Sequence, residues 1–177
     1  MIRRLEEPDI ESLVTLRREA LVSDPFAFSS SPDTDVGLDP EFLRKAMRNT
    51  SAQGMFGAFE DGALVGMAGV YRQDKAKEAH KAGVWGMYVR PAHRGRGLGR
   101  ELLSAAIEFA RSLPGVTHLH LSVSETAPAA LRLYQSMGFV TWGTEPGALT
   151  GTPEESPHAG FHPTDSDTGG EPCDTST

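Results

Sequence analysis

Three glycines, Gly95, Gly97 and Gly99, alternate with other residues just before a stretch with helical apolar periodicity. Glycine lets a backbone approach a ligand closely, and the first amides of a helix point outward with the positive end of the helix dipole. Positive charge is also dense here, with four arginines within eleven residues: Arg90, Arg94, Arg96 and Arg100. This combination predicts a loop that binds an anion, most naturally phosphate.

Two other phosphate-binding patterns fit the loop poorly. A P-loop would end in Gly-Lys followed by Ser or Thr, whereas Gly99 is followed by Arg100. The dinucleotide pattern Gly-x-Gly-x-x-Gly would need a glycine where Leu102 stands, and no βαβ repeat begins near the N-terminus. Taken alone, however, the glycine pattern is also compatible with a tight structural turn.

A second motif, Leu133-Tyr134-Gln135-Ser136-Met137-Gly138-Phe139, follows the glycine loop by about forty residues. Together the two segments resemble the GCN5-related N-acetyltransferase (GNAT) family, which combines a loop of the form Arg/Gln-x-x-Gly-x-Gly/Ala with a later Leu-Tyr-x-x-x-Gly-Phe. The resemblance extends over residues 1 to about 142 and includes the order of the expected elements. It implies acetyl-coenzyme A as co-substrate, without a metal, and acetyl transfer to an amine.

The resemblance also implies roles for individual residues. Arg94 would open the loop, and main-chain amides would bind the coenzyme A pyrophosphate within the segment Arg94, Gly95, Arg96, Gly97, Leu98, Gly99 and Arg100. The preceding strand, at Met87, Tyr88 and Val89, would pair with the pantetheine arm and supply an N–H that polarises the thioester carbonyl. Ala127 stands where many relatives have an asparagine that binds pantetheine, which predicts a loss of about 1 kcal/mol of binding.

Acyl transfer to an amine needs a proton for the departing sulfur and a neutral attacking nitrogen. Tyr134 matches the family position proposed to protonate the thiolate, although a tyrosine on a helix can also serve packing alone. The positions where some relatives carry a glutamate base are Gly83 and Ser122, which cannot serve. Strand alternation places His118, His120 and Ser122 on one face, which the resemblance implies is turned toward the acceptor amine, so we take His120 as the candidate base, with water as the alternative.

These residues need a scaffold, and the sequence predicts its elements. In chain order we expect a strand at 2–5, helices at 10–21 and 41–48, strands at 55–60, 63–71 and 82–90, a helix from 98, a strand at 116–123, a helix at 129–135 and a strand from 139. Asp61-Gly62 predicts a type I′ hairpin turn, Asp39 a helix N-cap, and Gly138 a helix C-cap. The long loop at 22–40 contains Phe26 and Phe28, which are expected to fold back onto the domain.

The end of the chain has a different composition. All 17 Lys and Arg lie in residues 1–143 together with 17 of the 24 Asp and Glu, so residues 144–177 carry the whole net charge of −7. This segment has few apolar residues and predicts an acidic, disordered tail after an N-acetyltransferase domain at 1–143. The family normally has a final strand after this point, but the sequence after Trp142 contains no apolar run that would predict one. The sheet would then have an open edge, receive a strand from a partner, or belong to a chain whose end has been altered.

The remaining composition limits the classes of partner. The body is neutral overall, which argues against nucleic acid, and neither a membrane-spanning run nor a signal peptide is present, so a cytoplasmic protein is expected. The single cysteine, Cys173, has no partner for a disulfide or metal nearby in sequence. The acceptor would be a small-molecule amine or a protein amine, and a homodimer is compatible with the sequence.

The sequence therefore predicts one α/β domain with a mixed, mostly antiparallel GNAT-type sheet, helices on both faces, and a C-terminal strand in doubt. Its predicted activity is direct transfer of acetyl from acetyl-coenzyme A to a primary amine. Two alternatives stay open: a coenzyme A binding protein without efficient turnover, and a nucleotide-binding module.

Overall fold

A computed structural model of the chain describes residues 1–148 and 158–163. Its strands are β1 (Ile2–Arg4), β2 (Gln53–Glu60), β3 (Ala63–Arg72), β4 (Lys81–Val89), β5 (His118–Ser124), β6 (Phe139–Glu145) and β7 (His158–Pro163). They form a sheet in the order β1-β2-β3-β4-β5-β7-β6, in which only β4 and β5 are parallel. The predicted mixed, mostly antiparallel sheet is confirmed.

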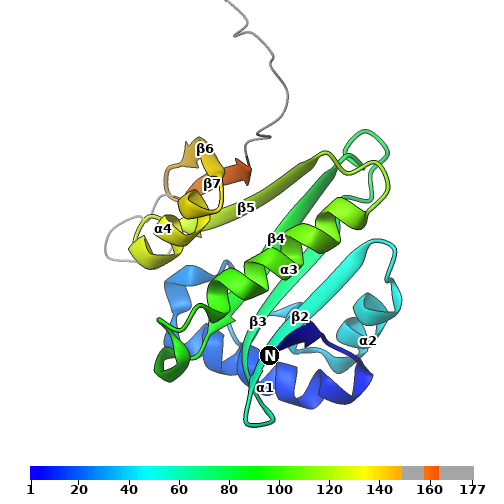
Figure 1. Ribbon diagram of the computed structural model, residues 1–177, viewed down its shortest axis with the longest axis vertical. Coiled ribbons are helices and arrows are strands. Elements are labelled where there is room, and N and C mark those ends of the chain that lie inside the picture. Colours follow the sequence, from blue (N-terminus) through cyan, green and yellow to red (C-terminus); the bar gives the residue numbers. More distant parts are fainter. Residues whose placement is uncertain (149–157, 164–177) are drawn as a thin grey trace, which may run out of the picture.

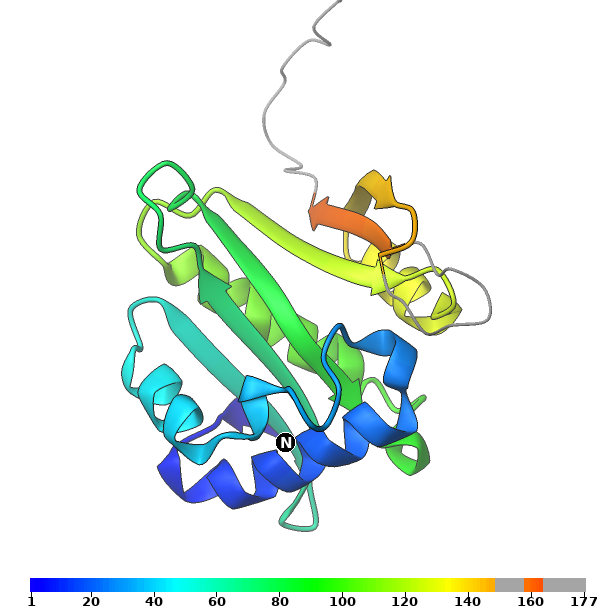
Figure 2. The same ribbon diagram turned by 180° about the vertical axis from the view of Figure 1, so that it is seen from behind.

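Helices cover both faces of this sheet, as expected. The α-helices are α1 (Ile10–Ser23), α2 (Pro40–Arg48), α3 (Leu98–Ser112) and α4 (Pro128–Ser136), and short 3-10 turns lie at Glu7–Asp9, Pro25–Ala27, Val36–Leu38 and Pro91–His93. Helix α3 crosses one face (Figure 1), whereas α1 and α2 lie on the other (Figure 2). Two core clusters result, one centred on Leu102 and Leu103 of α3 and the other on Leu13 and Leu16 of α1.

The turns and caps follow the local chemistry of the sequence. Asp61 and Gly62 have φ values of 49° and 79°, the left-handed geometry that joins β2 to β3 in a two-residue hairpin. Asp39 caps α2 by accepting a hydrogen bond of 2.9 Å from the Glu41 amide. These features were predicted correctly because each depends only on neighbouring residues.

The parallel pair β4–β5 is short and then opens. Residues Lys81–Gly83 pair with His118–His120, after which the two strands diverge and β4 continues to Val89 beside β3 alone. The register between β3 and β4 shifts opposite Ala68, where Gly86 has φ of 64°. This bulge changes the alternation, so Trp85 and Tyr88 pack with the α1 core and Met87 with the α3 core.

The C-terminal region departs from the expectation. Strand β6 continues to Glu145, past the predicted boundary at 143, and β7 at residues 158–163 pairs with both β5 and β6. The final strand is therefore present in the chain itself, and the interpretation of 144–177 as a tail without a strand is wrong for β7. The predicted disorder of residues 149–157 and 164–177 lies outside the described residues.

Candidate functional site

The glycine loop has the geometry of an anion cradle. Gly95 and Gly97 have φ values of 78° and 85°, and α3 begins immediately afterwards at Leu98. The amides of Gly95, Arg96 and Gly97 donate no hydrogen bond to another described residue, and the amides of the first turn of α3 have no intrahelical acceptor. A row of backbone donors at the positive end of a 15-residue helix thus lies open to a negatively charged group.

The arginines of the loop are held by neighbouring groups. Arg94 donates to Asp24 at 2.7 Å and to the Val89 carbonyl at 2.8 Å, which joins the end of α1 to the end of β4. Arg96 donates to Glu60 at 3.1 Å, and the same carboxylate pairs with His93, whose hydrogen bond lowers the pKa of Glu60. Acidic residues thus neutralise part of the charge of Arg94 and Arg96, although each guanidinium group keeps further N–H donors.

A cavity of about 940 Å³ lies between this loop and the diverging strands. It is lined by most of the residues that the sequence assigned to coenzyme A: Met87, Tyr88, Val89, Arg94, Gly95, Gly97, Leu98, Gly99 and Arg100. Its far wall is formed by α4 and the segment before it, and another wall by the turn after α1. Arg96, which turns toward Glu60, is the one predicted cofactor residue that does not line the cavity.

Tyr134 stands in the wall of this cavity, on α4. The side chain is buried, and burial raises the pKa of Tyr134 to about 12. Its hydroxyl lies 3.8 Å from the sulfur of Met87 on β4 and is oriented to donate to that atom. At neutral pH the phenol is therefore protonated and is directed at the part of β4 that borders the cavity.

His120 occupies a separate environment, away from the lining of this cavity. Leu119, Leu121 and Val123 pack under α3 with Tyr134, so alternation turns the His120 side chain to the opposite face of β5. Its ring centroid lies 6.0 Å from that of Trp142 and 6.4 Å from that of His162. Burial, with added repulsion from His118 and Lys81, lowers the pKa of His120 from its ordinary value, which favours the neutral imidazole at pH 7.

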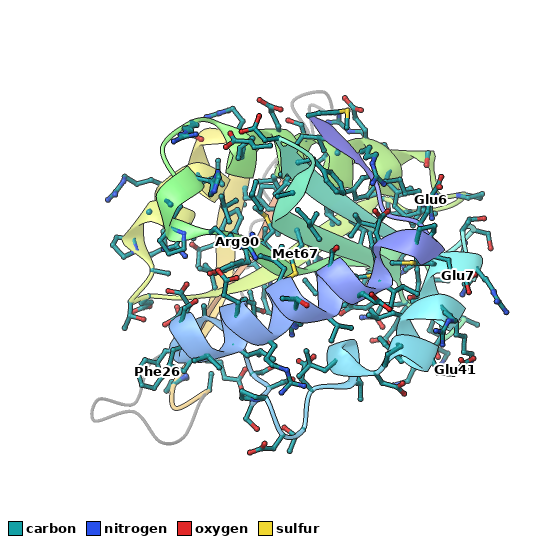
Figure 3. The ribbon with its side chains drawn as sticks, turned by 90° about the horizontal axis from the view of Figure 1, so that it is seen from below. Glu6, Glu7, Phe26, Glu41, Met67 and Arg90 are labelled. Atoms are coloured by element: carbon teal, nitrogen blue, oxygen red, sulfur yellow. The ribbon has the colours of Figure 1, made fainter. Side chains whose placement is uncertain are left out.

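The structure also brings residues to the cavity that sequence reasoning missed or left without a role. The turn after α1 contributes residues Ser23 to Phe28, and Phe26 is 42% exposed there, on the side away from Glu41 of α2 (Figure 3). The N-terminal end of α4 contributes Thr126 to Ala130. The sequence signal for the first segment was the pair of phenylalanines in a polar loop, which indicated folding back but not a destination.

Two classes of feature are absent from the part of the chain that the structure describes. Within residues 1–148 and 158–163, no cluster of three or more His, Cys, Asp or Glu has an arrangement that could hold a metal ion. Across the same residues, no helix combines the length and apolar character that a bilayer span requires. Cys173 lies outside these residues.

Comparison with known proteins is consistent with this geometry. A family model described as the acetyltransferase (GNAT) family matches residues 14–139. The crystal structure of a GCN5-related N-acetyltransferase from Kribbella flavida superposes with a TM-score of 0.77 at 28% identity, covering 92% of this chain and 95% of that one. An acetyltransferase of the GNAT family from Streptococcus pneumoniae shares the fold with a TM-score of 0.80 at 24% identity, covering 92% and 97% of the two chains.

Characterised relatives match over shorter segments. Streptothricin acetyltransferase from Streptomyces lavendulae is 41% identical over 71 residues, which are 40% of this chain and 37% of the relative. N-alpha-acetyltransferase RimI from Mycobacterium tuberculosis is 41% identical over 87 residues, which are 47% of this chain and 49% of the relative. The chain thus spans less than half the length of these two relatives.

Proposed function

This chain belongs to the acetyltransferase (GNAT) family, and from that premise we propose that it is an N-acetyltransferase that moves acetyl from acetyl-coenzyme A to a primary amine. The observation that carries the proposal is the row of open amides from Gly95 to Gly97 before α3, in a loop whose Gly95 and Gly97 line a cavity of about 940 Å³ that Tyr134 also lines. Phosphate-binding donors and a protonated phenol are the two groups that this chemistry needs at opposite ends of the co-substrate.

In this proposal the amides of the loop bind the pyrophosphate, and the exposed edge of β4 binds pantetheine. Because β4 and β5 diverge after Gly83 and His120, the main chain of β4 at Met87 to Val89 is available to pair with the amide groups of that arm. One of its N–H groups would stabilise the negative charge that develops on the thioester oxygen. Tyr134 would then donate its proton to the departing sulfur, in the place where it now meets the sulfur of Met87.

We assign His120 as the base that accepts the proton of the attacking amine. Its depressed pKa keeps it neutral and able to accept a proton at pH 7. It lies on the face of β5 opposite Tyr134, which is the arrangement expected if acceptor and co-substrate approach from different sides of the opened strands.

The His120→Gln variant tests this assignment. We expect kcat to fall about tenfold, a small loss for a general base because water can take over part of the role. In the wild type, kcat/KM should fall as the pH drops through the lowered pKa of His120, and the variant should lose this limb of the profile. His118→Gln, at an exposed histidine on the same face, is the control: it should keep this limb and move it to higher pH, because His118 no longer lowers the pKa of His120. An unchanged pH profile in His120→Gln would remove His120 from the mechanism.

Ala127 offers a test in the direction of gained binding. It lines the cavity as the N-cap of α4 and makes no side-chain cap. Ala127→Asn should tighten acetyl-coenzyme A binding about fivefold, since one added hydrogen bond contributes about 1 kcal/mol. The variant should also raise the unfolding temperature, because asparagine caps helices well. Ala127→Ser separates the effects: it caps α4 but lacks an amide, so calorimetry should show stabilisation with little gain in affinity.

The acceptor is proposed only as a primary amine on a small molecule or a protein, because the two relatives above carry different acceptors in their names. The decisive experiment follows release of free thiol from acetyl-coenzyme A with a panel of amines, beside heat protection by the same compound. Protection without thiol release from any amine would favour a binding protein. Protection by ATP or NAD in its place would favour a nucleotide-binding module.

A further inference from the structure

A buried arginine on the face of the sheet opposite Tyr134 has a donor without an acceptor. The side chain of Arg17 on α1 is 8% exposed. Asp35 accepts hydrogen bonds from its Nε at 3.3 Å and its Nη2 at 2.7 Å. Its Nη1 is buried and has no hydrogen-bond partner among the described residues. An unpaired buried donor is costly, so the position calls for an oxygen from solvent or from a ligand.

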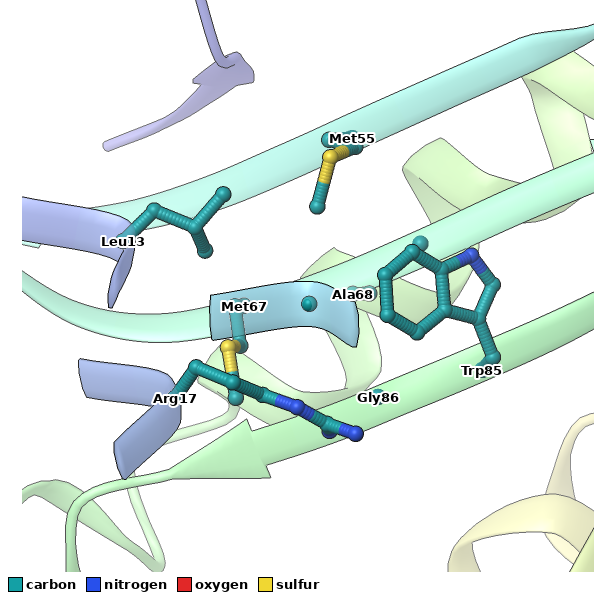
Figure 4. A pocket seen from close by; sticks show the side chains of 9 residues that line it. Leu13, Arg17, Met55, Met67, Ala68, Trp85 and Gly86 are labelled. Carbon is teal, nitrogen blue, oxygen red and sulfur yellow. The ribbon is translucent and has the colours of Figure 1, made fainter. Parts of the chain in front are cut away.

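The surroundings fix where this donor points. The guanidinium group lies over the ring of Phe28, 4.7 Å from its centroid, and 5.6 Å from the centroid of Trp85. A Cβ placed on Gly86 would lie 3.3 Å from Nη1, so the donor lies against the bulge of β4. Figure 4 shows the side chain extending from α1 toward Gly86 and Trp85. Held on two sides by aromatic rings and on a third by Asp35, Nη1 has little freedom to turn elsewhere.

A small cavity adjoins this donor. It is bordered by Arg17, Trp85, Gly86 and apolar side chains that include Met67, and its volume is about 10 Å³. That is about the space of one water molecule or of one ligand oxygen atom. Its walls are otherwise apolar, so Nη1 is the group that would determine which atom enters.

The cavity is next to the proposed reaction centre along the chain. Gly86 precedes Met87, whose sulfur lies 3.8 Å from the hydroxyl of Tyr134. Arg17 thus approaches β4 from the α1 face at one residue, and Tyr134 approaches from the α3 face at the next. If the thioester carbonyl binds to this part of β4, an acceptor amine that reaches it from the α1 face brings its own neighbouring atoms close to Nη1.

The charge balance indicates which kind of oxygen fits. Burial alone would raise the pKa of Asp35, but the hydrogen bond and charge of Arg17, together with hydrogen bonds from Ser30 and Gly37, outweigh it and lower the pKa, so the Arg17–Asp35 pair is ionised and neutral overall. A second carboxylate at Nη1 would be buried beside Asp35 without a compensating charge, which is unfavourable. A carbonyl oxygen needs one donor and no counter-charge.

We propose that Nη1 of Arg17 binds the carbonyl oxygen next to the acceptor amine, so that the acceptor is the N-terminal residue of a peptide or an amino-acid amide. This inference rests on the proposed function, because it concerns the amine side of the same transfer. Arg17 acts as a specificity-determining residue that positions the amine and takes no part in proton transfer. The rings of Trp85 and Phe28 hold its guanidinium group in place beside Gly86 of β4.

The test compares three amines of similar size: alaninamide, alanine and isopropylamine. Rates of thiol release are expressed per concentration of neutral amine, which removes the differences in amine pKa. We expect kcat/KM for alaninamide to exceed that for isopropylamine about tenfold, the effect of one hydrogen bond to a charged donor, and to exceed that for alanine as well. Equal values for alaninamide and isopropylamine, or faster turnover of alanine, would overturn the inference.

Variants separate recognition from folding. Arg17→Met should bring the alaninamide to isopropylamine ratio close to one, through a higher KM for alaninamide, and Arg17→Lys should restore part of the ratio. Arg18→Met, the same change at the exposed neighbour on α1, should leave the ratio as in the wild type. If Arg17→Met fails to fold, the alaninamide to isopropylamine ratios of Arg17→Lys and of the wild type test the proposal instead. A structural role alone would lower both rates equally and leave the ratio unchanged, contradicting the proposal.

The outcome also distinguishes this inference from the proposed function. If no amine of the wider panel releases thiol, the proposed activity fails. If amines are acetylated but a neighbouring carbonyl makes no difference, the activity stands and only the role of Arg17 fails. A water molecule held permanently at Nη1 would give that second result.

Discussion

Replacement of Tyr134 by phenylalanine is expected to lower kcat about 100-fold, the usual contribution of one general acid. Burial raises the pKa of Tyr134 to about 12, so the phenol is protonated throughout the range in which the enzyme would work. The variant keeps the aromatic ring that packs 6.1 Å from Phe139, so folding should be preserved. Binding of acetyl-coenzyme A, measured by calorimetry, should change by no more than about twofold, because the lost hydroxyl acts mainly on the charge that develops during transfer.

The control for this experiment is another tyrosine of the chain. Tyr71 lies on β3, is 36% exposed, and lies outside the lining of the large cavity. Tyr71→Phe removes the same atom and should leave kcat close to that of the wild type. Because the pKa of Tyr134 is about 12, wild-type kcat should show no decrease from deprotonation of Tyr134 below about pH 10. Wild-type turnover in Tyr134→Phe would show that the thiolate leaves without this acid.

Replacement of Gly97 by aspartate should abolish most of the affinity for coenzyme A. Gly97 has φ of 85°, a conformation that aspartate tolerates better than most residues, and a Cβ there meets no atom within 4 Å. The new carboxylate would stand among the open amides. Two like charges about 4 Å apart near a protein surface repel by about 4 kcal/mol, so a loss of at least about 100-fold is expected. Equilibrium binding of coenzyme A provides the measurement.

Two further variants separate charge from backbone strain. Gly115 has φ of 76° and equally free surroundings, but it lies beyond the opposite end of α3. Gly115→Asp should carry a similar strain and leave coenzyme A affinity unchanged. Gly97→Asn keeps the shape without the charge and should lose only about tenfold, the effect of crowding one hydrogen-bond donor or two. If Gly97→Asp binds as tightly as the wild type, the pyrophosphate does not occupy this loop.

The pairing of the loop arginines affects how such binding should respond to salt. Asp24 holds Arg94, and Glu60 holds Arg96. In the proposed site, these ion pairs leave the main-chain donors, the helix dipole and Arg100, which among the described residues pairs only with the neutral Ser136, as the attraction for a phosphate group. Fixed dipoles of this kind act over a short range and are screened little by salt, so the salt dependence of binding should come mainly from Arg100.

Much of the fold follows from short-range signals in the sequence. The Asp61-Gly62 turn, the Asp39 cap and the glycine loop are each specified within a few residues, because they depend on backbone dihedrals and on a cap that neighbouring atoms complete. Apolar periodicity located α3 and its neighbouring strands for a similar reason, since one face of each element must be buried. The placement of Tyr134 on α4 could be predicted because its motif is contiguous.

The final strand and the relation between the two faces of the sheet could not be predicted in this way. Residues 158–163 have too little apolar character to predict a strand on their own, and β7 forms because it fills the place between β5 and β6. The proposal of His120 as the base depends on which side of the sheet its side chain faces. Alternation along β5 groups His120 with His118 and Ser122, but it does not say which helices cover that face.

By itself, therefore, the sequence determined the class of fold, the glycine loop before α3 and the helix that carries Tyr134, all of which reside in contiguous segments. Only the tertiary structure decided that Arg17 of α1 pairs with Asp35, 18 residues later in the chain, and lies against Gly86 of β4. This packing leaves one buried donor of Arg17, Nη1, beside β4. Contacts of this kind depend on how helices settle on a twisted and bulged sheet. No local preference of the chain specifies that packing, because many partners of similar chemistry could satisfy each residue until the fold selects one.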